Sequence, residues 1–201
     1  MHSHRRRFTT ALVLTPMVLS GCVPVVATSM AVGSFAVIDR RTLGTQTDDT
    51  EIELRAAGRL PDAIRGARGV SVTSFNRSVL LTGQVPDPAA KTEAERAVRQ
   101  VNGVRNVFNE LEVGPRVSFT TIANDTQLTA RVKGAFLEQK VLDSTAVKVV
   151  TENGVAYLMG LVTQREGPAY ATAASRVSGV RRVVTLFDYI SDEDLARIRA
   201  R

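Results

Sequence analysis

The chain has 201 residues and a formal net charge of +6, from 26 Lys and Arg against 20 Asp and Glu. Its single cysteine excludes a disulfide within the chain, and its two histidines, His2 and His4, lie at the extreme N-terminus. Removal of an N-terminal leader would therefore exclude a Ser–His or Cys–His nucleophile pair and a His-ligated zinc.

The N-terminal segment has the plan of a secretory signal peptide. Three arginines, Arg5 to Arg7, precede a charge-free apolar run that ends in Leu19-Ser20-Gly21-Cys22. This tetrapeptide resembles the lipobox of bacterial lipoproteins, so we expect residues 1–21 to be removed and Cys22 to be the lipid-attachment residue. An uncleaved membrane span is the alternative, because about 20 apolar residues suffice to cross a bilayer, but prolines and glycines interrupt the run.

Cleavage would leave 180 residues, which is room for one large domain or two small ones. Because three arginines leave with the leader, the net charge would fall to +3. That balance suits a surface beside anionic lipid and lacks the dense basic stripe of a nucleic-acid binder, so we expect no nucleic-acid partner.

The rest of the chain contains two copies of one unit. Val70–Val85 aligns with Val147–Val162 at a shift of 77, and Val101–Val107 aligns with Val177–Val183 at a shift of 76. The duplication predicts a lipidated N-terminus and linker over 22–47, a first module over 48–113, a linker over 114–121, a second module over 122–190, and a short C-terminal helix or tail over 191–201.

Within each copy the hydrophobic pattern predicts helix, strand, strand, helix, strand. Alternating apolar residues flank Asn76-Arg77 and Asn153-Gly154, which predicts a β-hairpin in each copy. In the first copy, Asp87 and Pro88 are typical of a helix start. We therefore expect an α+β fold with two tandem modules, each with two helices on a three-stranded mixed sheet. Modules this small have thin cores, which predicts that they pack against each other.

The opening helices of the two copies are expected to differ. Gly58 and Pro61 predict a shortened or irregular helix in the first copy. Asp125 is expected to cap an amphipathic helix in the second copy, with Leu128, Val132, Ala135 and Phe136 on its inner face. Pro168 predicts that the other helix of the second copy begins near that proline.

Five segments carry a family resemblance: Asp39–Asp49, Asn124–Thr126, Val147–Gly154, Leu158–Thr163 and Ser175–Val180. They resemble the dual BON-domain outer-membrane lipoproteins, the division- and outer-membrane-stress-associated lipid-binding family, related through their domains to the osmotically inducible periplasmic protein. The resemblance covers nearly everything after Cys22. It implies a lipid-anchored protein on the periplasmic face of the outer membrane that supports membrane integrity and cell division. It also implies no catalytic residues, cofactor, metal or small-molecule substrate.

The resemblance places the lipid contact on the opening helix of the second module, over 126–137. At 100° per residue, Ala130, Lys133 and Leu137 point outward, while Gln127, Arg131 and Gly134 lie on one flank. These six residues are the expected phospholipid-binding site, with Arg131 and Lys133 meeting the phosphates of an anionic membrane. The chain departs from relatives that carry an aromatic residue at the position of Gln127.

Two other classes of function are weighed against lipid binding. The first is a protein-binding adaptor that recruits envelope proteins such as cell-wall remodelling or outer-membrane assembly factors. The second is an enzyme, but the paired carboxylates near Glu93 and Asp192 lie in solvated helical stretches rather than in a pocket. The short pattern over 66–69 resembles the GxxG loop of nucleic-acid-binding KH modules, but four residues are a weak signal and a plain helix-to-strand turn is the favoured interpretation.

Overall fold

The computed structural model describes residues 39–64, 69–139 and 142–200. The expected signal peptide, Cys22, most of the first linker and the GxxG residues 66–68 lie outside the described residues. Residues 37–201, which include both copies of the repeat, form one compact unit.

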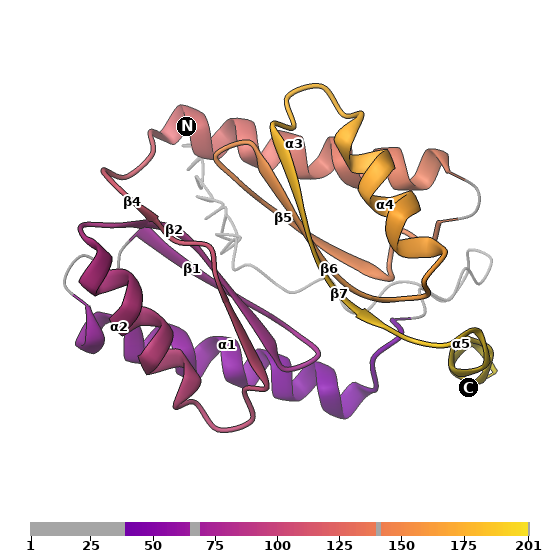
Figure 1. The fold of residues 1–201 in the computed structure, drawn as a ribbon, viewed down its shortest axis with the longest axis horizontal. Coiled ribbons are helices and arrows are strands. Elements are labelled where there is room, and N and C mark those ends of the chain that lie inside the picture. The colour runs from indigo at the N-terminus through magenta and orange to yellow at the C-terminus, as the bar shows by residue number, and fades with distance from the viewer. Residues whose placement is uncertain (1–38, 65–68, 140–141, 201) are drawn as a thin grey trace, which may run out of the picture. The chain divides into compact units, whose positions relative to one another are not determined.

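The first module consists of two helices and a mixed sheet (Figure 1). Strand β2 pairs antiparallel with β1 and parallel with β3 and β4, so the predicted mixed sheet is confirmed. The elements in chain order are α1 (Leu43–Ala63), β1 (Val70–Phe75), β2 (Ser78–Val85), α2 (Pro88–Arg99), β3 (Asn106–Asn109) and β4 (Glu112–Val113).

The second module repeats this arrangement, with β6 antiparallel to β5 and parallel to β7. A C-terminal helix, α5, follows it and is capped by Ser191, whose hydroxyl accepts a hydrogen bond from the Asp194 amide. Of the two expectations for 191–201, the short helix is confirmed. The elements are α3 (Phe119–Glu138), β5 (Val147–Glu152), β6 (Val155–Val162), α4 (Glu166–Ser175), β7 (Arg182–Tyr189) and α5 (Asp192–Arg199).

A buried carboxylate on the opening helix holds the hairpin turn in each module. Asp49 accepts backbone hydrogen bonds from Asn76 and Arg77, both at 2.7 Å. Asp125 accepts them from Asn153 at 2.7 Å and Gly154 at 2.9 Å. All four turn residues have positive φ, as expected for a two-residue hairpin turn. The prediction that Asp125 caps a helix was therefore wrong, because its carboxylate serves the turn instead.

The structure corrected two predictions about helix starts and breaks and agrees with a third. Helix α3 begins at Phe119, six residues before Asp125, with Ser118 as its N-cap. Helix α1 is continuous for 21 residues, with Pro61 inside its last turn, so neither Gly58 nor Pro61 shortens it. Helix α4 begins at Glu166, two residues before Pro168, which agrees with the expected start near that proline. At this start, Thr163 and Glu166 exchange hydrogen bonds in the pattern of a capping box.

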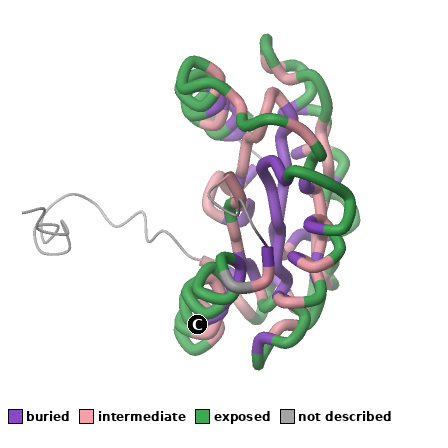
Figure 2. The backbone as a smooth tube through the Cα atoms, turned by 90° about the vertical axis from the view of Figure 1, so that its left-hand side faces the viewer, coloured by how far each residue is buried: buried purple, intermediate pink, exposed green. Residues whose placement is uncertain are grey.

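The core lies in three apolar layers. One cluster joins β1–β3 to α1 and α2, and a second joins β5–β7 to α3 and α4. A third cluster, formed by Phe75, Leu80, Val155, Tyr157 and Met159, comes from the sheet faces that point away from the helices of their own module. The two modules therefore pack sheet against sheet, as predicted, with the buried strands central and the exposed helix faces outside (Figure 2).

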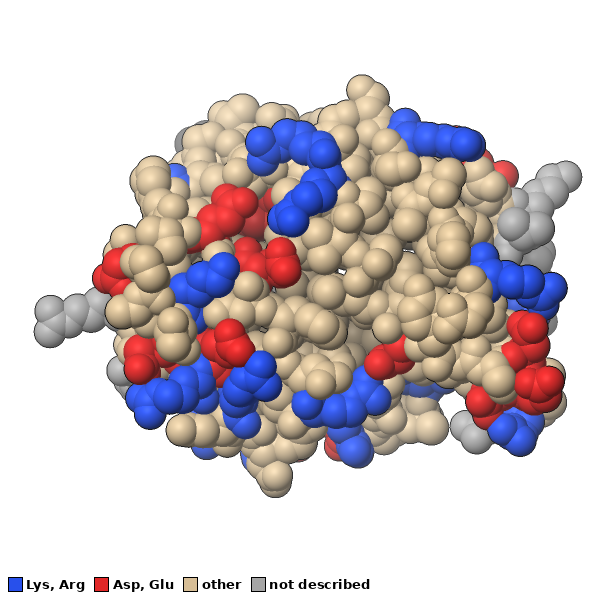
Figure 3. Space-filling model, in the orientation of Figure 1, with Lys and Arg blue, Asp and Glu red and all other residues tan. Residues whose placement is uncertain are grey.

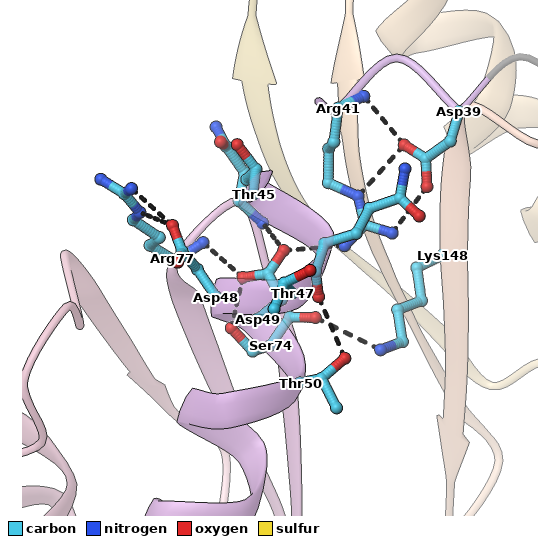
Figure 4. A network of polar contacts seen from close by, with 12 residues as sticks. Asp39, Arg41, Thr45, Thr47, Asp48, Asp49, Thr50, Ser74, Arg77 and Lys148 are labelled. Atoms are coloured by element: carbon cyan, nitrogen blue, oxygen red, sulfur yellow. Dashed lines mark hydrogen bonds and ion pairs between the residues drawn. The ribbon is translucent and has the colours of Figure 1, made fainter. Parts of the chain in front are cut away.

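A strap of three residues, Asp39-Arg40-Arg41, joins the modules at the edge of this interface. Arg40 is 5% exposed and donates to both carboxylate oxygens of Glu166 and to the Leu161 carbonyl in the second module. Arg41 pairs with Asp49 of the first module at 2.7 Å and lies 4.2 Å from the centroid of the Phe75 ring. Figure 4 shows the Arg41 side of this network, with Lys148 of the second module reaching toward α1.

The carboxylate of Glu152, which lies at the interface between the modules, destabilises the fold when it is ionised. Burial raises the pKa of Glu152, and the negative charges of Asp125 and Glu112 raise it further. A hydrogen bond from Gln84 lowers it by less, so the pKa remains raised. Because its folded-state pKa lies above the ordinary value of 4.5, ionised Glu152 destabilises the fold at neutral pH. We expect Glu152→Gln to raise the free energy of unfolding at pH 7, with the gain shrinking as pH falls toward 4.5. Urea denaturation across pH 4–8 measures this, and a loss of stability at pH 7 would contradict it.

Candidate functional site

Helix α3 covers the outer side of the second sheet with one face and leaves the other to solvent. Its inner face is buried at Asp125, Leu128, Val132 and Phe136. Phe136 meets the Tyr170 ring of α4 edge to face, with the centroids 5.0 Å apart. This packing fixes the rotation of α3 about its axis and therefore decides which side chains point outward.

The six residues predicted for lipid contact all lie on the solvent side of α3. Gln127, Ala130, Arg131, Lys133 and Leu137 are exposed, and Gly134 is half-buried. Leu137 is 68% exposed, so it contributes little to the core of the second module. The structure thus brings the six together on one face, although their contact with lipid stays a prediction.

The two cations of this face are available for a ligand. Within the described part of the chain, neither Arg131 nor Lys133 forms an ion pair. Most other arginines are engaged, including those of the i,i+3 and i,i+4 pairs on α2. A cation without an acidic partner can approach phosphate with no competing ion pair to break.

Two exposed apolar residues of α3 escaped the sequence analysis. Phe119 is 89% exposed and Ile122 is 44% exposed. Both lie in the first turns of α3, where Phe119 was assigned to the linker and Ile122 to the start of the second module. Comparison of the two copies could have found them, because Thr42 caps α1 as Ser118 caps α3, at the repeat shift of 76. In both cases the capping hydroxyl accepts from the backbone amide three residues later.

Helix α1 offers an internal comparison with α3. Its exposed leucines, Leu43 (80% exposed) and Leu54 (75% exposed), correspond at the repeat shift to Phe119 and Ala130. The charges differ, however. Helix α1 contains five acidic residues and two arginines, whereas α3 contains two acidic residues, one of them the buried Asp125, and two basic residues. Of the two related helices, only α3 is electrostatically suited to an anionic surface.

Charges of both signs are mixed on the face of the molecule shown in Figure 3. On the face in Figure 3, acidic and basic side chains alternate around the rim and leave a broad uncharged area between them. Among the residues that the structure describes, no cluster of His, Cys, Asp and Glu could hold a metal ion. In the same described residues, every helix is too short or too polar to pass through a bilayer.

The repeated unit corresponds to a known domain. The BON domain family matches residues 48–115 and again residues 124–190. The chain belongs to the BON-domain family. The two matches fall on the two halves of the duplication, so each sheet with its two helices is one BON domain, and α5 lies beyond both.

Curated relatives extend the match over most of the chain. The outer membrane lipoprotein DolP of Haemophilus influenzae is 41% identical over 86% of this chain and 90% of its own length. The 21 kDa hemolysin of Actinobacillus pleuropneumoniae is 33% identical over 76% of this chain and 80% of its own length. The osmotically-inducible protein Y of Escherichia coli is 30% identical over 70% of this chain and 72% of its own length. The predicted resemblance to dual BON-domain proteins is confirmed.

Proposed function

We propose that this protein is a non-catalytic lipoprotein of the outer membrane that binds anionic phospholipid through helix α3 of its second BON domain. Acyl chains on Cys22 hold it at the periplasmic face, where it supports membrane integrity and cell division. The observation that carries the lipid-binding claim is the exposed face of α3, where Arg131 and Lys133 lie near Leu137 and form no ion pair with any described residue. The relationship to a protein named an outer membrane lipoprotein supports the location.

The energetics favour a weak, reversible contact that the anchor reinforces. Each cation near an anionic membrane surface contributes about 1 kcal/mol, so Arg131 and Lys133 together contribute about 2 kcal/mol. Alone, such a contact would be transient. A lipid anchor raises the effective concentration of the helix at the membrane, which makes a weak contact sufficient.

Charge reversal on α3 tests the proposal. Residues 37–201 form a compact unit with its own cores, so this fragment can be mixed with vesicles without its anchor. At a lipid concentration high enough to compensate for the missing anchor, we expect it to sediment with phosphatidylglycerol vesicles and not with phosphatidylcholine vesicles. Lys133→Glu replaces an attraction by a repulsion, so it should weaken binding by about 2 kcal/mol, or roughly 30-fold.

Arg59→Glu is the matched control for this experiment. It makes the same change in charge at an exposed position on α1, where we expect little effect on vesicle binding. Equal binding of the wild-type fragment to both kinds of vesicle would overturn the lipid proposal. Equal weakening by both variants would show that net charge matters and the face of α3 does not.

Protein binding is the second candidate function, and helix α1 favours it. Leu43 and Leu54 are exposed there among acidic residues that an anionic membrane would repel, so an envelope protein suits this face better than lipid does. Crosslinking in cells distinguishes the two functions. Partners retained by Lys133→Glu and lost by Leu54→Ser would place the protein contact on α1.

A further inference from the structure

Helix α3 carries a longer apolar stripe than the six predicted residues. Phe119 and Leu137 are 18 residues apart, which is five full turns of an α-helix, so they share one direction about the axis. They mark the two ends of a line about 27 Å long at 1.5 Å per residue. Between them, small or apolar side chains at Ile122, Ala123 and Ala130 lie within about 60° of the same direction.

The end of this stripe at Phe119 is its most apolar part. Phe119 is 89% exposed and Ile122 is 44% exposed, and neither packs in any of the three core clusters. A phenylalanine left in water forgoes the stabilisation that burial of a large apolar side chain provides. An exposed apolar line beside cationic side chains is the pattern of a helix that lies flat in a membrane interface.

Resting on the proposed function, we infer that Phe119 is the residue that α3 inserts into the lipid, with Leu137 inserted at the other end of the same line. Charge complementarity selects lipid as the occupant, because Lys133 lies within this stripe, about 40° from Phe119, and has no acidic partner among the described residues. Arg131, also without an acidic partner there, lies further round the helix, about 120° from Phe119. Gln127 lies about 80° from Phe119 around the helix. That angle places Gln127 at the level of the headgroups, where a polar amide is suitable and an aromatic residue is not needed.

The absence of tryptophan from the chain allows a direct measurement of insertion. We propose three single-tryptophan variants of residues 37–201: Phe119→Trp, Leu137→Trp and, as the control, Leu43→Trp at the matching position on α1. Each replaced side chain is at least 68% exposed, so little packing is lost, and circular dichroism checks the fold. The fluorescence of each variant is recorded with phosphatidylglycerol vesicles, with and without bromine atoms on the acyl chains.

We expect the emission of Trp at positions 119 and 137 to shift to shorter wavelength and to be quenched by the brominated chains. Emission from position 43 should not change. A response at 137 without one at 119 would overturn this inference and leave the proposed function intact. The absence of vesicle binding by the wild-type fragment would instead defeat the proposed function, and this inference with it.

A salt series gives a second, independent readout. Because 0.5 M salt screens the attraction of Lys133 to phosphate, the binding that remains should depend on apolar insertion. We expect Phe119→Ser to weaken binding about tenfold at low and at high salt alike. The effect of Lys133→Glu should shrink as salt rises. An effect of Phe119→Ser no larger than that of Leu43→Ser would contradict the insertion of Phe119.

Discussion

Replacing Glu166 by glutamine is expected to lower the free energy of unfolding by about 3–5 kcal/mol at pH 7, because it leaves the Arg40 charge buried without its partner. The Arg40 side chain is 2% exposed, and its guanidinium lies 2.7 and 2.8 Å from the two Glu166 oxygens. Glutamine keeps an oxygen that can accept the capping hydrogen bond from the Thr163 amide. The variant therefore removes the charge with little change in shape.

The loss should depend on pH in a defined direction. Burial alone would raise the pKa of Glu166, but the hydrogen bonds from Arg40 and Thr163 and the Arg40 charge outweigh it and hold the pKa below its ordinary value of 4.5. A depressed folded-state pKa contributes stability that is present above pH 4.5 and is lost as pH falls through the folded-state pKa. The difference between wild type and Glu166→Gln should therefore be constant from pH 6 to 8 and shrink in acid.

The exposed ion pair between Glu93 and Arg96 supplies a control for Glu166→Gln, with the free energy of unfolding of each variant measured by chemical denaturation. Glu93 and Arg96 also lie 2.7 Å apart, but their side chains are 41% and 67% exposed. Removing the Glu93 charge with Glu93→Gln should cost less than about 1 kcal/mol, because water screens the pair. If Glu166→Gln proved as mild as Glu93→Gln, the strap would not be holding the two BON domains together.

The second large effect on stability is expected from a substitution in α3, where the neighbouring residues Phe136 and Leu137 face opposite ways. Phe136 is fully buried against Tyr170, and Phe136→Ala should lower the free energy of unfolding by about 3–5 kcal/mol through loss of apolar contact and the cavity that remains. Leu137 is 68% exposed, so Leu137→Ala should change stability by less than about 0.5 kcal/mol.

For vesicle binding, the larger effect should come from Leu137→Ala and the smaller one from Phe136→Ala. Leu137→Ala is expected to weaken binding to phosphatidylglycerol vesicles, while any Phe136→Ala protein that remains folded should bind as wild type does. Thermal unfolding and vesicle sedimentation of the two variants measure both effects. A strongly destabilised Leu137→Ala variant would mean that this leucine belongs to the core and does not face the membrane.

Local patterns in the sequence were sufficient to predict the two hairpins on which the sheets are built. The hairpin of the second module is specified by Asn153-Gly154, a dipeptide that accepts positive φ, placed between strands of alternating apolar residues. In the first module Asn76-Arg77 adopts the same conformation, held by the Asp49 carboxylate. The helices were harder to predict because tertiary packing overrides propensity. Helix α1 continues past Gly58 because Ile52, Ala56 and Leu60 are buried along one of its faces.

Contacts that are distant in sequence could not be predicted from local patterns. Arg40 forms an ion pair with Glu166, which lies 126 residues away in the sequence. No pattern in the sequence around either residue predicts this pairing. The same holds for the outward face of α3. Phe119 looked like part of an apolar join, and only the packing of Phe136 and Val132 shows that the first turn of this helix points its aromatic ring into solvent.

Mass spectrometry of the N-terminal peptide tests most directly whether this protein is held at a membrane by lipid. Protein purified from the membrane fraction of its own cells should begin at Cys22, with acyl chains adding their mass to that residue. Such a tether would keep the α3 face within reach of phospholipid throughout the life of the protein. A soluble protein that still begins at Met1, with a free thiol at Cys22, would contradict both the location and the proposed function.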